Sequence, residues 1–187
     1  MHRAIEPPLD ASPFVRRSRR LAAAYGFARD AHDRRRRVGG STIDHPAAVA
    51  KLLYDAGYPE HVVISALLHD VVEDTATGLE ELCNRFGEDV GSLVATLTEN
   101  PRIREYPRRK AELRDRAATR GHHAAAIFAA DKLASARALN AAGVRVPSEK
   151  IEHYQHTVHA VRAHHPEVPF LDWLDAEIAR LRLRSPA

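Results

Sequence analysis

The chain has 187 residues, and 28 lysines and arginines against 25 aspartates and glutamates give it a formal charge of +3. That length suits one domain that can bury a core without covalent staples. A single cysteine, Cys83, excludes an internal disulfide framework and a cysteine-rich zinc module. The longest apolar stretch, Ala124 to Ala130, is too short to cross a bilayer. The N-terminus lacks the apolar core of a signal peptide, so we expect a cytoplasmic protein.

Residues 1–13 contain three of the 11 prolines and no apolar period, which predicts a flexible arm before a domain over residues 14–187. Beyond the arm, apolar residues recur at three- and four-residue steps between turn residues, the pattern of amphipathic helices. The expected helices span residues 16–37, 46–57, 60–72, 77–86, 88–98, 107–120, 122–142, 148–164 and 171–183. No segment alternates β-branched residues, which argues against a sheet. The sequence therefore predicts an all-α, single-domain bundle of about eight helices.

Local signals refine the ends and faces of these helices. Thr77 and Glu80 have the spacing of a capping box, so their side chains are expected to close the start of that helix. Ser148 is expected to cap the helix that it begins. Cys83 and Trp173 are expected in the core.

A histidine and an aspartate, His69 and Asp70, end the most apolar helical segment of the chain, residues 62–68. Burying these two side chains is costly unless they pair or bind a metal. Glu73 and Asp74 follow four residues after His69 and Asp70, so a continuous helix would present all four side chains on one side. The alternative is a set of buried ion pairs that only shapes the core.

Two further residues fit such a cluster. Asp131 ends another apolar run, residues 124–130, and His45 precedes a proline at the start of a helix. Two imidazoles and two carboxylates form a mixed nitrogen and oxygen set that suits Mn²⁺, Fe²⁺, Co²⁺ or Zn²⁺ better than Ca²⁺ or Mg²⁺. An ion of this kind would lower the pKa of a bound water. Glu73 and Asp74 could orient that water and handle its proton.

These residues give the chain a resemblance to the HD superfamily of metal-dependent phosphohydrolases. His45, His69-Asp70 and Asp131 match its H…HD…D signature. The resemblance is closer to one branch, the hydrolase domain of Rel/SpoT-type alarmone enzymes and the single-domain small alarmone hydrolases. A ten-residue block around His69 reads like that branch's ALLHDVVEDT. The resemblance covers about residues 21–140 and implies the all-α HD fold.

The resemblance implies a role for each residue at a matching position. The implied metal ligands are His45, His69, Asp70 and Asp131, and the residues near the attacking water are Glu73 and Asp74. The implied substrate-binding residues are Arg36, Arg37, Thr42, Lys132 and Ser135. The implied cofactor is one divalent ion, Mn²⁺ in the first place, with Fe²⁺, Co²⁺, Zn²⁺ or Ni²⁺ as alternatives. The implied reaction is removal of the 3′-pyrophosphate from the nucleotide (p)ppGpp.

Two departures from the family pattern touch substrate recognition. Thr42 stands where the family has a tyrosine, and Ser135 stands where it has a nucleotide-contacting asparagine. The ligand set is intact, so the sequence supports metal-dependent hydrolysis more strongly than it supports this substrate. The alternatives are a phosphohydrolase of another nucleotide, such as a dNTP or NADPH, and an HD-fold sensor that binds nucleotide and metal without turnover.

Other charged segments point less clearly to a function. A basic cluster over residues 102–110 is interpreted as an exposed helix face or as a clamp on a polyphosphate tail. The repeat of His153, His156 and His159 is interpreted as surface, and His32 as a helix-packing residue. The charge of +3 and the lack of aromatic residues among the arginine runs argue against nucleic-acid binding. The expected partner is a small nucleotide, with no nucleic acid and no membrane, and a homo-oligomer is left open.

Overall fold

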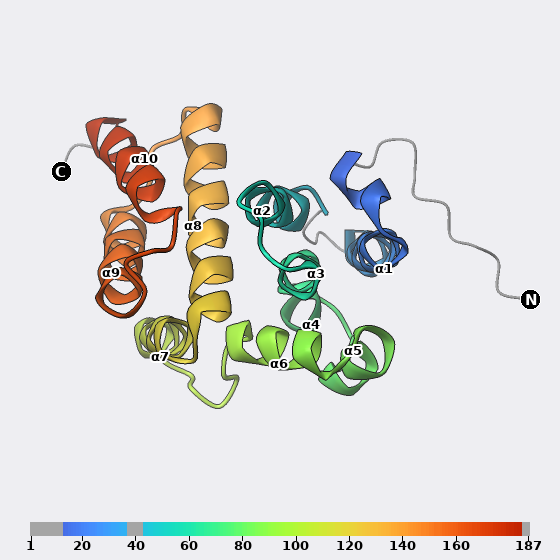
Figure 1. Cartoon of the computed structure of the whole chain (residues 1–187). Coiled ribbons are helices and arrows are strands. Elements are labelled where there is room, and N and C mark those ends of the chain that lie inside the picture. The colour runs from blue at the N-terminus through green and yellow to red at the C-terminus, as the bar shows by residue number, and fades with distance from the viewer. Residues whose placement is uncertain (1–12, 37–42, 185–187) are drawn as a thin grey trace, which may run out of the picture. The chain divides into compact units, whose positions relative to one another are not determined.

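The structure is a computed structural model that describes residues 13–36 and 43–184 (Figure 1). Throughout these residues the regular structure is helical, and no strand occurs in them. The predicted all-α fold is therefore confirmed. The chain divides into two compact units, with the boundary between Thr98 and Glu99, and each unit has its own core.

The first unit is built around the apolar helix α3. Its elements are the 3-10 helix η1 (Pro13–Arg17) and the helices α1 (Arg19–Arg36), α2 (Asp44–Asp55), α3 (Glu60–Leu68), α4 (Val71–Asp74), α5 (Leu79–Phe86) and α6 (Glu88–Leu97). All residues from Val62 to Leu68 are buried, because α1, α2 and α6 pack against α3. A helix that is apolar all round is stable only when neighbours cover it. His69 and Asp70 follow the last turn of α3 and therefore lie next to the core of this unit.

The second unit is organised around its longest helix, α8. Its helices are α7 (Tyr106–Thr119), α8 (His122–Ala142), α9 (Ser148–His164) and α10 (Leu171–Arg184). The helices α7, α9 and α10 all pack against α8, and the run from Ala124 to Ala130 is buried. Gly143 ends α8 in the left-handed region, with a φ of 67°, and its N–H donates to the carbonyl oxygen of Asn140. Glycine adopts this conformation without the steric cost of a side chain.

The predicted helix ends lie within three residues of those in the structure, except at one place. The helix predicted over residues 122–142 has those bounds. The helix predicted over residues 60–72 stops at Leu68 and resumes at Val71 as the short α4. Because of this interruption, the nine helical ranges predicted from the sequence become ten α-helices in the described residues. The turn between α3 and α4 carries the predicted His-Asp pair.

Two predicted helix caps are wrong. The helix after the Thr77 segment starts later, with Gly78 as its N-cap and no side-chain cap. Thr77 instead belongs to the turn that ends α4, where its N–H donates to the hydroxyl of Thr75 at 3.1 Å. Helix α9 begins at Ser148 as predicted, but Pro147 occupies the N-cap position and makes no side-chain cap.

Two residues expected in the core are not buried there. Trp173 is 50% exposed, because α10 turns Leu171 and Leu174 inward instead. The guanidinium carbon of Arg137 lies 5.6 Å from the centre of the Trp173 ring. Cys83 is only half-buried. Apolar character alone therefore did not identify the inward face of these helices.

Within the described residues, no helix is both long enough and apolar enough to cross a membrane. The cytoplasmic location stays a prediction. Residues 1–12 of the predicted arm lie outside the described residues. The arm and the single domain over residues 14–187 also stay predictions.

Candidate functional site

His69 lies in the turn after α3 and is buried, with 6% of its surface exposed. Its Nδ1–H donates to the carbonyl oxygen of Ala66 at 2.8 Å. Because a carbonyl oxygen only accepts hydrogen bonds, the proton sits on Nδ1 and a neutral ring keeps the lone pair on Nε2. A backbone carbonyl fixes metal-binding histidines in this way, since it sets both the tautomer and the ring orientation.

The Nε2 atom of His69 faces a carboxylate instead of a donor. It is buried and has no hydrogen-bond partner among the described residues. The Oδ1 atom of the Asp70 carboxylate lies 3.1 Å from this Nε2 atom. Two acceptor atoms at this separation repel each other unless a proton or a cation lies between them. The pair therefore fits a bound divalent ion, the role that the sequence predicts for it.

His45 is the other predicted imidazole ligand of the first unit. It is the second residue of α2 and is half-buried, and α2 packs against α3. The ring centres of His45 and His69 are 5.6 Å apart, and the ring planes differ by 58°. Imidazoles this close can present one nitrogen each to the same ion. The structure thus brings His45, His69 and Asp70 together.

Glu73 and Asp74 form the second half of the short helix α4. The N–H of Asp74 donates to the carbonyl oxygen of Asp70 at 2.8 Å, so a helical turn joins these two residues despite the break after α3. Glu73 is exposed and Asp74 is half-buried. Both carboxylates therefore lie within one turn of the His69-Asp70 pair and can exchange protons with solvent.

Asp131, the fourth predicted ligand, belongs to the second unit. It is half-buried at the end of the buried run of α8. Its Oδ2 atom is 2.5 Å from Nζ of Lys132, and its Oδ1 atom accepts a hydrogen bond from Oγ of Ser135 at 3.5 Å. The same Nζ lies 4.6 Å from the centre of the Phe128 ring. Two of the predicted substrate-binding residues therefore hold Asp131.

A cavity of about 760 Å³ opens in the second unit beside these residues. Helices α7, α8 and α9 form most of its wall. Its lining includes the cationic residues Lys110, Arg114, Lys132 and Lys150 and the polar or aromatic residues Tyr106, Ser135, His153 and Tyr154. Two carboxylates, Glu149 and Glu152, also line it. Cavities of this size hold small-molecule ligands, and the cations suit a ligand with several negative charges.

The cavity changes the pKa values of two of its residues. Burial lowers the pKa of His153 to about 3, and Lys132, Lys110 and Arg114 add to this effect. Burial raises the pKa of Tyr154 well above its usual value, with the charge of Asp131 acting in the same direction. Both side chains are therefore neutral at pH 7, and they leave the charge of the cavity to its lysines, arginine and acids.

The predicted basic cluster divides into two parts. Arg109 and Lys110 both pair with Glu99, and a guanidinium N–H of Arg109 donates to the carbonyl oxygen of Ile103 at 3.0 Å. Burial raises the pKa of Glu99, but Lys110 and Arg109 outweigh it and hold this pKa below its usual value. Lys110 also lines the cavity, whereas Arg102 is exposed. One part of the cluster is therefore exposed, and another part pairs with Glu99 and reaches the cavity.

Several predicted residues are not tested by this geometry. Arg37 and Thr42 lie outside the described residues, and so does the side chain of Arg36, so their roles stay predictions. The interpretation of His153 as a surface residue is wrong, because it lines the cavity and is half-buried. The interpretation of His32 as a helix-packing residue is confirmed by its complete burial.

Sequence reasoning missed most of the cavity. Tyr106, Arg114 and Tyr154 come from α7 and α9, which no local motif connects. A partial signal exists for Tyr154, because it belongs to the buried stripe of α9 together with Ile151 and Val158. That stripe indicates packing, however, and only the folded chain shows that it borders a cavity.

Comparison with known proteins identifies the family. A family model described as HD domain matches residues 24–164, so this chain belongs to the HD domain family. The relationship that the sequence predicts is thereby confirmed.

Within this family, the chain is similar to three proteins whose names describe an activity. A guanosine-3′,5′-bis(diphosphate) 3′-pyrophosphohydrolase of Aquifex aeolicus is 38% identical over 102 residues, which are 54% of this chain and 14% of that protein. The Homo sapiens pyrophosphohydrolase MESH1 is 37% identical over 125 residues, which are 64% of this chain and 69% of that protein. A solved structure of a metazoan ortholog of SpoT that hydrolyzes ppGpp superimposes with a TM-score of 0.70 and 27% identity, over 88% of this chain and 96% of that one. The chain therefore spans a small part of the Aquifex relative and most of the two animal proteins.

Proposed function

We propose that this protein is a metal-dependent phosphohydrolase that removes the 3′-pyrophosphate from (p)ppGpp. The observation that carries the proposal is the buried Nε2 atom of His69, which has no donor among the described residues and lies 3.1 Å from a carboxylate oxygen of Asp70. The naming of human MESH1 as a guanosine-3′,5′-bis(diphosphate) 3′-pyrophosphohydrolase supports the choice of substrate.

The proposed ligands of the ion are His45, His69, Asp70 and Asp131. The first three are supported by their placement around the turn after α3, and Asp131 by its position in the HD signature. This mixed nitrogen and oxygen set suits a divalent transition metal better than Ca²⁺ or Mg²⁺. The resemblance to the alarmone hydrolases puts Mn²⁺ first, with Fe²⁺, Co²⁺, Ni²⁺ and Zn²⁺ as alternatives. When bound, such an ion lowers the pKa of a water toward neutrality and polarises a phosphoryl oxygen.

Glu73 and Asp74 are the proposed proton-handling residues. A carboxylate accepts the proton of the attacking water while the water oxygen bonds to the phosphorus attached at the 3′ position. The bond between that phosphorus and the 3′ oxygen breaks, and the 3′ oxygen takes up a proton. The products of ppGpp are then GDP and pyrophosphate. The exposure of Glu73 lets the proton leave to solvent after each cycle.

The cavity of the second unit is the proposed phosphate-binding region. Lys110, Arg114 and Lys132 line it, and the planar guanidinium of Arg114 can bind two phosphate oxygens at once. Tyr106 also lines it and is 61% exposed, so its ring offers a face on which a purine can stack. The ligand is expected to displace Lys132 in part from Asp131.

A phosphohydrolase of another nucleotide is the second candidate. The observation that favours it is Ser135, whose hydroxyl points to Asp131 where the family carries an asparagine amide. The shorter side chain reaches less far into the cavity and offers one hydroxyl in place of an amide. A nucleotide sensor without turnover is the third candidate.

A substrate panel distinguishes these candidates. The full chain is supplied with Mn²⁺ and, in separate reactions, with ppGpp, each dNTP and NADPH, and phosphate-containing products are separated by ion exchange. The proposal expects pyrophosphate release from ppGpp at a higher kcat/KM than any product from the others. Release from a dNTP or NADPH alone supports the second candidate. Thermal stabilisation by ppGpp and Mn²⁺ without any product supports the sensor, and both results overturn the proposal.

A further inference from the structure

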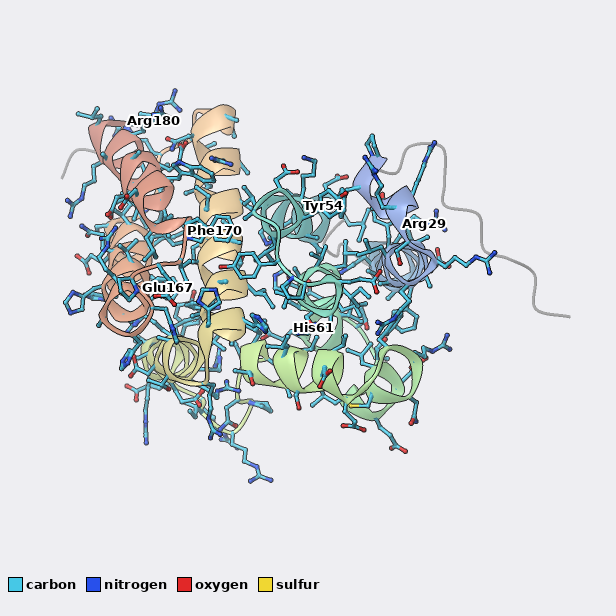
Figure 2. The ribbon with its side chains drawn as sticks, in the orientation of Figure 1. Arg29, Tyr54, His61, Glu167, Phe170 and Arg180 are labelled. Carbon is cyan, nitrogen blue, oxygen red and sulfur yellow. The ribbon has the colours of Figure 1, made fainter. Side chains whose placement is uncertain are left out.

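A second cluster of metal-ligand side chains lies in the second unit, at one end each of α8 and α9. His122 is the first residue of α8, His165 follows the last residue of α9, and Glu167 lies in the loop before α10, where it is labelled in Figure 2. One ligand atom of each lies within 4.8 Å of the other two. On α8, His122 is nine residues from Asp131, about 13 Å along the helix, so this cluster is separate from that proposed ligand.

Both imidazoles direct Nδ1 at the same carboxylate oxygen. The Oε1 atom of Glu167 is 2.9 Å from Nδ1 of His122 and 3.6 Å from Nδ1 of His165. In a tetrahedral site with metal–ligand bonds of about 2.0–2.1 Å, neighbouring donor atoms are about 3.3 Å apart. The two separations in the structure lie on either side of that value. All three ligand atoms lie within 4.8 Å of one another, so a modest approach of the side chains would bring them to one ion.

The backbone holds the ligands in place before an ion binds. The N–H of His165 donates to the carbonyl oxygen of Val161 at 2.7 Å, and the N–H of Val168 donates to that of His165 at 3.2 Å. The backbone N–H of Glu167 lowers the pKa of its side chain, and His122 lowers it further, so this group is a carboxylate at neutral pH. A carboxylate beside two imidazoles is ready to bind a cation.

A plain ion pair explains only part of this arrangement. A hydrogen bond from His122 to Glu167 needs one imidazole, yet the ring of His165 lies 5.7 Å from that of His122 and faces the same oxygen. The partial positive charge at the start of α8 opposes a cation, and the partial negative charge at the end of α9 favours it. The three side chains, rather than the helix dipoles, therefore provide the affinity.

We propose that His122, His165 and Glu167 bind a divalent transition metal of the zinc class, Zn²⁺, Co²⁺ or Ni²⁺. Two imidazoles and one carboxylate prefer these ions to Ca²⁺ and Mg²⁺. Three protein ligands leave at least one position for water, and the ion connects the start of α8 to the loop between α9 and α10. The proposal does not rest on the hydrolase activity, because none of its residues belongs to the proposed hydrolytic site.

The test is the number of zinc ions bound by the full chain and its variants, measured by equilibrium dialysis and elemental analysis. His165→Ala and Glu167→Gln should each bind one zinc ion fewer per chain than the unchanged protein. The matched control His164→Ala, an exposed histidine next to the cluster, should lose none. Zinc at about 100 times its Kd should raise the Tm of the unchanged protein by about 5–10 °C more than that of His165→Ala.

Two results would overturn the proposal. One is an equal zinc content in the unchanged protein, His165→Ala and Glu167→Gln. The other is a loss of one ion in His164→Ala as well, which would indicate binding to surface histidines in general. Circular dichroism shows whether each variant is folded. If His165→Ala does not fold, the zinc content of Glu167→Gln decides the test. Hydrolysis of ppGpp with Mn²⁺ should be unchanged in both variants. If neither the unchanged protein nor any variant hydrolyses ppGpp, that result contradicts the proposed function and leaves the zinc site unaffected.

Discussion

Two buried helical runs, one in each unit, end on residues of the proposed metal centre but hold them by different means. After residues 62–68 of α3 the chain turns, and the carbonyl oxygen of Ala66 orients His69. After residues 124–130 of α8 the helix continues, and the side chains of Lys132 and Ser135 hold Asp131. Backbone orients the ligand of the first unit, whereas side chains orient the ligand of the second.

This difference predicts which substitutions near the proposed metal centre leave its ligands in place. A backbone carbonyl is present whatever residue stands at its position, so the orientation of His69 tolerates change around it. Asp131 shares its carboxylate with the ammonium group of Lys132, so a divalent ion must compete with this group. We therefore expect loss of the His69 ring itself to remove the ion, and changes to the side chains that hold Asp131, such as Lys132, to tune the affinity for the ion.

The largest effect is expected from His69→Ala in the first unit. Loss of the hydrogen-bond partner of a metal ligand typically costs about 10–100-fold, so removal of the ligand His69 itself should lower kcat/KM for ppGpp by at least about 100-fold. Mn²⁺ binding, measured by calorimetry, should weaken in parallel. His159→Ala, an exposed histidine of α9, is the control and should keep both properties. Activity that survives in His69→Ala would show that this residue is not a ligand.

Arg114→Gln in the cavity of the second unit should act on the substrate and not on the ion. Arg114 lines the cavity, and 16% of its side-chain surface is exposed. A charge-assisted hydrogen bond to phosphate contributes about 1.5–3 kcal/mol, so KM should rise about 10–100-fold while Mn²⁺ affinity stays the same. The exposed Arg108→Gln on the same helix is the control. A change in Mn²⁺ affinity without a change in KM would contradict the division between the two units.

Lys132→Met tests the side-chain support of Asp131. The variant keeps an apolar side chain of similar length but removes the ammonium group from the half-buried carboxylate of Asp131 and from the ring of Phe128. Without metal, the free energy of unfolding in urea should fall by about 1–3 kcal/mol. Stabilisation by Mn²⁺ should increase, because the ion no longer competes with the ammonium group. Lys51→Met removes the exposed pair with Asp55 and should cost about 0–1 kcal/mol, and a similar loss in both variants would refute this expectation.

His153→Gln tests the electrostatics of the cavity through pH. The pKa of His153 is about 3 in the folded protein against an ordinary value of 6.5, so between these values the folded protein binds fewer protons than the unfolded chain. The contribution of His153 to stability is thus fully present above pH 6.5 and is lost as the pH falls toward 3. The slope is at most about 1.4 kcal/mol per pH unit. Urea unfolding between these pH values should be flatter in His153→Gln than in His156→Gln, and equal slopes would contradict the prediction.

The smallest effect is expected from Ser135→Asn, which restores the residue typical of the family. The amide adds a donor and an acceptor to the wall of the cavity, so kcat/KM for ppGpp should rise about 2–10-fold. The measurement compares ppGpp with the best dNTP, because a change shared by both would reflect the ion and not the base. A decrease for ppGpp alone would show that the cavity of this protein suits another nucleotide.

The sequence was enough to predict the helices and part of the site because both depend on local patterns. Apolar residues spaced by three or four positions indicate a helix, and a charged pair after the apolar run of residues 62–68 indicates chemistry. The turn at His69 and Asp70 was not predictable, because the apolar pattern continues past it into Val71 and Val72. The pattern of apolar and polar residues does not indicate a helix break of only two residues.

The cavity and the second metal cluster were beyond sequence reasoning for a different reason. Their residues come from segments far apart in the chain, such as His122 and Glu167, which are 45 residues apart. Among 12 histidines, spacing alone does not identify which imidazoles face each other. Only the packing of α7 and α9 against α8 brings these side chains together.

The most direct test of the central claim is the release of pyrophosphate from ppGpp as the concentration of free Mn²⁺ is varied. We expect GDP and pyrophosphate in equal amounts, a rate that rises with Mn²⁺ until the site is saturated, and loss of the reaction in EDTA. Product formation that is unaffected by EDTA, or no product at any concentration of Mn²⁺, would contradict it.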